Sequence, residues 1–108
     1  MIDEILTQAG FVREVTYTQA VFLYPPPQPF VVYFDDIDVD GSDFTDDISE
    51  HAVRFELYAP DRAAPEAEQR ICAALRVHGV RYTVRSRVWI EAERYFLTVY
   101  EFDFTEKE

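Results

Sequence analysis

The chain has 108 residues, is rich in Phe and Tyr, and carries a net charge of 10 − 21 = −11. This length fits one small domain with a modest core, residues 1–108, and so much aromatic area is not typical of a disordered chain. The negative charge argues against ordinary nucleic-acid binding and against attachment to an anionic membrane, because both surfaces are anionic and repel it. Cys72 is the only cysteine, which excludes a disulfide framework and indicates a reducing cytoplasm.

The first part of the chain predicts one helix and one clear strand. Apolar residues recur at helical spacing over residues 2–9, and Gly10 would end that helix. Residues 11–24 are β-prone without a distinct pattern. The prolines between 25 and 29 impose an extended approach to a predicted strand at Phe30–Phe34.

The most acidic stretch follows this strand. Asp35–Glu50 holds eight carboxylates and no Lys or Arg, which predicts a solvated loop between two strands. Around Gly41, the spacing also imitates a calcium-binding loop, in which carboxylates at alternate positions wrap one cation. The calcium ligands would be Asp36, Asp38, Asp40 and Asp47. Asp47 is shorter than the Glu usual at its position and Asp43 replaces an apolar anchor, so the solvated loop is favoured and no cofactor is expected.

A half-buried strand and a second helix come next. Val53, Phe55 and Leu57 alternate with polar neighbours. His51 falls on the same strand face as Val53, and we expect it to be a packed or capping residue. Pro65 fits the first turn of a helix, with Asp61 as a plausible cap ahead of it. The apolar stripe of this helix comprises Ala67, Ile71, Ala74, Leu75 and His78, and Gly79 closes it.

The segment Val80–Phe104 predicts a β-hairpin with an apolar face and a charged face. A turn near Glu91-Ala92-Glu93 would place Arg81 opposite Asp103. On the apolar face we expect Val80, Tyr82, Val84 and Val88 with Phe96, Tyr100, Phe102 and Phe104. On the charged face we expect Arg81, Thr83, Arg85, Arg87 and Trp89 with Tyr95, Leu97, Val99, Glu101 and Asp103.

This hairpin lies in the one basic region, which has two interpretations. Its arginines are Arg76, Arg81, Arg85, Arg87 and Arg94. They could pair within the chain, with Glu101 and Asp103. Alternatively, an Arg-rich strand face could meet the acidic loop of a neighbouring copy in a head-to-tail contact. Aromatic residues and Arg are enriched in interfaces, so the interface candidates are Arg81, Arg85, Arg87, Trp89, Tyr95 and Leu97.

The order of these elements predicts an α+β fold. We expect a single antiparallel sheet of about four to five strands, with two helices packed on one face. The sequence has no Gly-rich phosphate loop, no nucleophile elbow and no His/Cys set at metal-ligand spacing. It therefore does not predict an enzyme.

Several stretches resemble the tail completion proteins of long-tailed phages and prophages, also called tail terminator or head–tail joining proteins. The resemblance rests on a pattern of strands and aromatic residues over most of the chain. Its parts are the N-terminal helix, Pro29–Tyr33, Val53–Tyr58 leading into a helix, Ile90–Tyr95 and Val99–Phe102.

This resemblance implies a structural subunit that forms a ring, commonly of six copies, on the finished tail tube. The implied partners are other copies of the chain, the tail tube protein and the head–tail connector, with DNA only as passing cargo and no membrane. The implied location is the host cytoplasm during assembly and then the virion tail or neck. An acidic lumen would keep DNA from sticking. The resemblance places near the lumen or a ring face Asp35, Asp36, Asp38, Asp40, Asp43, Asp46 and Asp47.

Two other functions fit the composition. An acidic DNA mimic could occupy a DNA-binding protein or nuclease, although a concentrated arginine patch does not serve that purpose. A calcium-binding interaction module would use the loop around Gly41. A test in solution distinguishes both from the tail completion hypothesis, since a DNA mimic would bind a basic protein and a calcium-binding module would gain stability from calcium.

Overall fold

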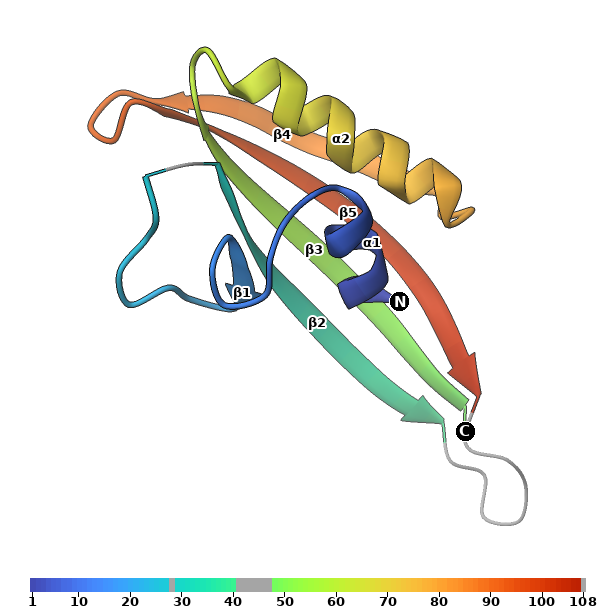
Figure 1. Ribbon diagram of the computed structural model, residues 1–108. Helices are drawn as coiled ribbons and strands as arrows, with labels where there is room; N and C mark the ends of the chain where they lie inside the picture. The colour runs from blue at the N-terminus through green and yellow to red at the C-terminus, as the bar shows by residue number, and fades with distance from the viewer. Residues whose placement is uncertain (28, 41–47, 108) are drawn as a thin grey trace.

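A computed structural model describes residues 1–27, 29–40 and 48–107. The described chain forms one five-stranded sheet in the order β1-β2-β3-β5-β4, with two helices on one face (Figure 1). The helices are α1 (Ile2–Gln8) and α2 (Ala64–Val77), and the strands are β1 (Tyr17–Gln19), β2 (Phe30–Asp40), β3 (Ile48–Pro60), β4 (Tyr82–Ile90) and β5 (Tyr95–Lys107). The predicted α+β class is confirmed.

The sheet is antiparallel except at one edge. β1 pairs parallel to β2, with Tyr17 opposite Val31, while β2, β3, β5 and β4 pair antiparallel in turn. Within the β-prone segment 11–24, only Tyr17–Gln19 forms a strand. The parallel edge was not predicted, because a three-residue strand carries too little pattern to show its partner.

β2 is longer than the sequence predicts. The predicted strand ended at Phe34, whereas β2 continues to Asp40, with Asp36 opposite Ala52 and Asp40 opposite Ile48. The prediction that residues 35–40 and 48–50 form a loop is therefore wrong. Pairing with β3 satisfies the backbone there, and this outweighs the low β-propensity of Asp. The remaining acidic positions, including Asp43, Asp46 and Asp47, lie outside the described residues.

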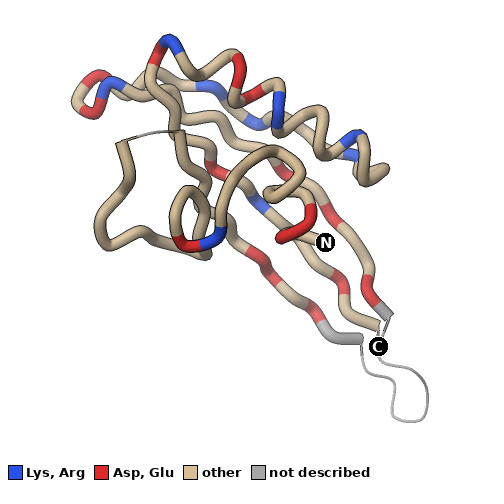
Figure 2. Tube along the Cα trace, viewed as in Figure 1, with Lys and Arg blue, Asp and Glu red and all other residues tan. Residues whose placement is uncertain are grey.

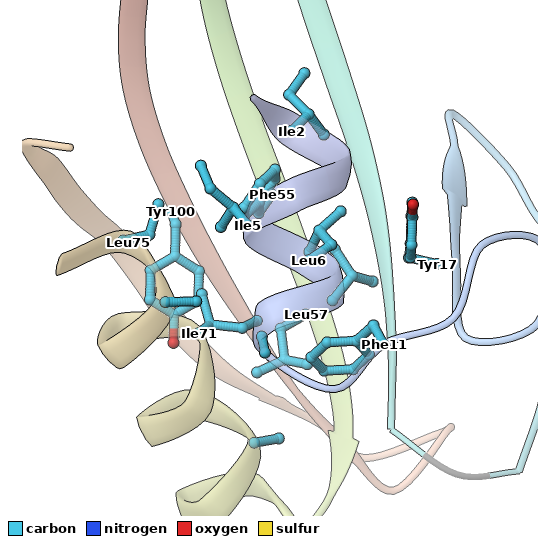
Figure 3. Packing of buried hydrophobic residues seen from close by; sticks show 14 of the residues in the cluster. Ile2, Ile5, Leu6, Phe11, Tyr17, Phe55, Leu57, Ile71, Leu75 and Tyr100 are labelled. Carbon is cyan, nitrogen blue, oxygen red and sulfur yellow. The ribbon is translucent and has the colours of Figure 1, made fainter. Parts of the chain in front are cut away.

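The core lies between the helices and one face of the sheet (Figure 3). From the sheet, Phe55, Leu57 and Tyr100 point to this side and are almost fully buried. The helices contribute Ile2, Ile5, Leu6, Ala64, Ala67, Ile71, Ala74 and Leu75. The stripe predicted for the second helix is thus the buried one, apart from His78, which is half-buried at the helix end.

The ends of α2 follow the predicted signals in part. Pro65 lies in the first turn, and Gly79, with a φ of 69°, ends the segment. The expected cap Asp61 is wrong: Ala63 occupies the N-cap position, and no side chain caps the helix. Pro65 needs no donor partner, which removes one of the groups that a cap would serve.

The molecule is elongated, with principal extents of 52 × 28 × 23 Å. The long strands β2, β3 and β5 continue past the helices, as Figure 1 shows at lower right. We call this extension the distal arm; its described residues are 35–40, 48–52 and 103–107. The helix-free side of the sheet is called the open face.

Candidate functional site

The hairpin of β4 and β5 contains a bulge that divides it into two registers. Tyr82 pairs with Phe102 and Val84 with Tyr100, which is the predicted register. After the bulge at Arg85, Ser86 pairs with Val99 and the register is shifted by one residue. A one-residue shift reverses the face of every later side chain.

The bulge separates the arginines that the sequence placed on one face. Arg85 donates its Nε–H to Glu101 Oε1 at 2.6 Å, on the open-face side of β5. Arg87 instead lies on the helix side, where its Nε–H meets Glu68 of α2 at 2.9 Å and its guanidinium lies 3.9 Å from the Phe96 ring centroid. The prediction of one shared arginine face is therefore wrong beyond Arg85.

The other interface candidates are divided in the same way. Trp89 is opposite Phe96 on the helix side, with ring centroids 5.0 Å apart, and Val88 has moved to the open face opposite Leu97. Tyr95 and Leu97 remain on the open face, where Tyr95 meets the edge of Phe30 at 6.0 Å. All three candidates are half-buried. Trp89 therefore belongs to the helix side of the sheet and Tyr95 and Leu97 to the open face, so the three candidates do not form one patch.

Charge is distributed unevenly along the long axis of the molecule. Figure 2 shows basic and acidic residues mixed along α2 and the hairpin turn, whereas the strands of the distal arm carry carboxylates. Within β4 there are two arginines and no acid, whereas Phe34–Asp40 of β2 has four aspartates and no base. β4 and β2 lie at opposite edges of the sheet, and the short strand β1 covers the first part of the β2 edge.

The open face is hollowed where β4 begins. The hollow runs from Phe34 and Arg54 to Arg81 and Thr83, and its acidic border includes Asp36 and Asp103. The Arg54 guanidinium lies 4.5 Å from the Phe34 ring centroid and 3.1 Å from Glu56 Oε2. Its mixed charges suit contact with another protein more than binding of an apolar small molecule.

On the distal arm, the exposed carboxylates of the open face lie on three adjacent strands. Asp36 and Asp38 belong to β2, Glu50 to β3 and Asp103 to β5, and all four are exposed. Asp36, Asp38 and Asp40 are spaced along an extended strand, so the turn predicted to wrap calcium does not form there. The fourth predicted ligand, Asp47, is outside the described residues.

The helix side of the distal arm holds a largely buried polar pair. His51 Nδ1 lies 2.9 Å from both oxygens of Asp35, and the two side chains are 11% and 12% exposed. The imidazole also stacks on Phe104, with ring centroids 4.2 Å apart. This confirms His51 as a packed residue on the face of Val53.

Five tyrosines have raised pKa values, and the shifts are large at Tyr17, Tyr58 and Tyr100. Burial is the main cause at each of these three, and it raises the pKa of Tyr17 and of Tyr58 to about 12, while that of Tyr100 rises further. Nearby carboxylates add to the effect, because the Tyr17 hydroxyl donates to Asp3 at 2.7 Å and that of Tyr58 donates to Glu56 at 3.0 Å. These hydroxyls stay protonated at neutral pH and serve as structural donors.

The described residues contain neither a metal-binding cluster nor a membrane-spanning helix. Within residues 1–27, 29–40 and 48–107, no group of three or more His, Cys, Asp or Glu side chains is placed to hold a metal ion. Among the helices of that same part, none has the length and apolar character needed to cross a bilayer.

These elements define an α+β protein whose open sheet face and acidic arm are its distinctive surfaces. The fold is similar to that of a chain in the structure described as "Virion of native gene transfer agent (GTA) particle", with a TM-score of 0.59 and 14% sequence identity. The match covers 96% of this chain and 84% of that chain. No protein-family model and no curated protein sequence matches.

Sequence reasoning missed the bulge and what depends on it. The contact of Arg87 with Glu68 joins residues 19 positions apart through that bulge, and no spacing rule foretells it. One signal was present: Arg85, Ser86 and Arg87 interrupt the alternation of apolar residues between Val84 and Val88. Interrupted alternation in a strand is one mark of a bulge.

Proposed function

We propose that this chain is a structural protein of a phage or prophage virion, and that its place is the junction of tail and head. The observation that supports the proposal is the fold, which is shared over nearly the whole chain with a chain of a gene transfer agent virion, a phage-like particle. The proposed role is structural rather than enzymatic.

In its specific form, the proposal is a tail completion protein. Six copies of the chain would form a ring that caps the tail tube and binds the head connector. Charge separation supports a head-to-tail arrangement, because the arginines of β4 and the aspartates of β2 are at opposite sides of one subunit. Arg81, Arg85 and Arg87 would lie at the contact between copies.

The acidic open face of the distal arm supports the passage of DNA through such a ring. Asp36, Asp38, Glu50 and Asp103 are exposed on one face of the arm, and carboxylates that face a channel would repel the phosphate backbone. DNA would then be cargo and not a ligand.

Gene deletion with complementation tests the role. Particles from a strain that lacks the gene should contain heads and tails that are not joined, and the wild-type gene should restore joined particles. Size exclusion with light scattering and negative-stain imaging should show rings with an open centre. Normal joined particles in the deletion strain would refute the proposal, as would absence of the chain from purified particles.

A DNA mimic is the second candidate, favoured by the same four carboxylates on adjacent strands. Such an inhibitor would bind a basic nuclease with an affinity that falls steeply as salt rises. Salt-dependent inhibition by a monomer that is absent from particles would favour this function over the virion role.

A further inference from the structure

Apart from the outer edge of the three-residue strand β1, two strand edges of the sheet lack a neighbouring strand within the described residues. β4 is the last strand on one side. On the other side, β1 pairs only with Val31–Tyr33, so the edge of β2 from Phe34 to Asp40 has no partner in the part of the chain that the structure describes. Unpaired strand edges with free N–H and C=O groups are templates for another strand.

The two edges have opposite charges. Arg85 and Arg87 lie on β4, with Arg81 directly before it, and Asp35, Asp36 and Asp38 lie on the free edge of β2. The bonds to Glu101 and Glu68 use the Nε–H of each strand arginine, and a guanidinium has further donors on its terminal nitrogens. Arg85, which lies on the open face as Asp36 and Asp38 do, can therefore also contact a carboxylate of a neighbouring copy.

We propose that β4 of one copy pairs antiparallel with the free edge of β2 in the next, so that one sheet continues around the ring. This inference rests on the proposed ring-forming role and specifies its contact. Three successive antiparallel pairings make β2 and β4 run in opposite directions, so copies related by rotation bring them together antiparallel, with all helices on the same side. The occupant of each edge is a second copy of this chain.

The side-chain pattern restricts the register. Ser86 is level with Val32 through Val99 and Glu56, and it lies on the open face. We measure the displacement of the neighbouring copy from the register in which its Ser86 would lie beside Val32. Side chains keep their faces across the contact only if this displacement is an even number of residues. A displacement of four places Ile90 beside Val32, where β1 already pairs. A displacement of six places Ile90 beside Phe34 and Ser86 beside Asp38 (38 − 32 = 6), clear of β1.

This displacement has the size that a closed barrel needs. Six residues at about 3.3 Å give about 20 Å along the strands, and four strands at about 4.8 Å give about 19 Å across them. The strands would thus tilt by about 45° to the ring axis, at the upper end of the range of about 35–45° typical of barrels. The result does not depend on the number of copies. The helices must lie outside, because inside they would block the channel, so the open face lines it.

Engineered disulfides test the contact. In a full-length Cys72→Ser background, Ser86→Cys with Asp38→Cys should give a reducible ladder of covalent oligomers, in concentrated protein or in purified particles. The matched control, Ser86→Cys with Ile37→Cys, points its two thiols to opposite faces and should give no ladder. Equal ladders from both pairs overturn the inference, as does no ladder from Ser86/Asp38 in particles that contain the chain.

Charge exchange is the second test. Arg85→Glu should lower the ring fraction at least tenfold, and adding Asp38→Arg should restore it, because both side chains lie on the open face and Asp38 is beside Ser86 in this register. Circular dichroism checks that each variant is folded. Rings that persist in the Arg85→Glu variant, or no restoration in the folded double variant, overturn the inference. Rings or particles that contain the chain without the edge contact leave the virion role intact, whereas absence of the chain from particles refutes that role itself.

Discussion

Arg87 of β4 donates its Nε–H to Glu68 of α2, at 2.9 Å from Oε1, and so connects the last strand of the sheet to the helix above it. The arginine also covers the Phe96 ring at 3.9 Å. Neither contact would exist without the bulge at Arg85, which turns Arg87 to the helix side. The bulge thus fixes which arginines stabilise the subunit and which face outward.

The Arg87–Glu68 pair can be measured with a double-mutant cycle. The two side chains are 42% and 20% exposed, so solvent screening limits their coupling to about 0.5–1 kcal/mol. Urea unfolding of Arg87→Ala, Glu68→Ala and the double variant gives this value. The control is Arg85 with Glu101, which are 62% and 40% exposed and should couple more weakly. A stronger coupling in the control would contradict the placement of Arg87.

How far the sequence predicts this fold depends on the kind of signal. The stripe of α2 and the alternation of Val53, Phe55 and Leu57 are local patterns of burial, and both were confirmed. The continuation of β2 through Asp35–Asp40 was missed, because its cause is pairing with β3 and not the preference of Asp. The half of the hairpin before Arg85 was correct, and the single extra residue reversed the remainder.

The same reasoning applies to the candidate site. Carboxylates at alternate positions were visible in the sequence, and the strand places Asp36 and Asp38 on one face as that spacing requires. The pairing of Asp35 with His51 could not be foreseen, because the two residues are 16 positions apart in sequence and meet only through the register of β2 with β3. Sequence indicates which groups share a face, whereas strand pairing decides which groups meet.

We expect His51→Ala to destabilise the protein by about 1–3 kcal/mol, because it leaves the largely buried Asp35 carboxylate without its partner. It also removes the stack on Phe104. Chemical denaturation measures the loss. Glu50→Ala is the control, since that neighbouring side chain is exposed on the opposite face and should change stability by no more than about 0.5 kcal/mol. Equal effects would show that the His51 pair contributes nothing specific.

Two positions near the end of α2 test the burial of its stripe. Leu75 is fully buried and Val77 is 67% exposed. Leu75→Ala should cost about 2–5 kcal/mol through lost burial and the cavity that remains, whereas Val77→Ala should change stability by about 0.5 kcal/mol or less. Thermal and urea unfolding compare the two variants. Similar losses would contradict the packing of α2 on the sheet.

The raised tyrosine pKa values predict alkaline unfolding. Tyr17 and Tyr58 ionise near pH 12 in the fold and near 10.0 when unfolded, so the unfolded chain releases their protons first. Their contribution to stability is complete below about pH 10 and is lost between about pH 10 and 12. Unfolding and tyrosinate absorbance followed together should change in this window, and Tyr58→Phe should reduce the pH dependence. Titration of every tyrosine near pH 10 with the fold intact would contradict the burial of these rings.

The acidic open face predicts how the protein treats DNA. Replacing Asp36, Asp38 and Asp103 with Asn and Glu50 with Gln changes the net charge from −11 to −11 + 4 = −7 and removes repulsion from the surface proposed to line the channel. The assembled variant should retain more duplex DNA at low salt than the wild-type ring, and the difference should shrink as salt rises.

The matched control changes four exposed acids near α2 and the hairpin turn, with Asp61→Asn and Glu→Gln at Glu66, Glu91 and Glu93, and reaches the same net charge of −7. If net charge alone governs DNA binding, both variants retain DNA equally. If the open face lines the path of the DNA, only the first variant does, because the control acids lie at the other end of the subunit (Figure 2). Filter binding at several salt concentrations separates these outcomes, and equal retention would remove the physical argument for an acidic lumen.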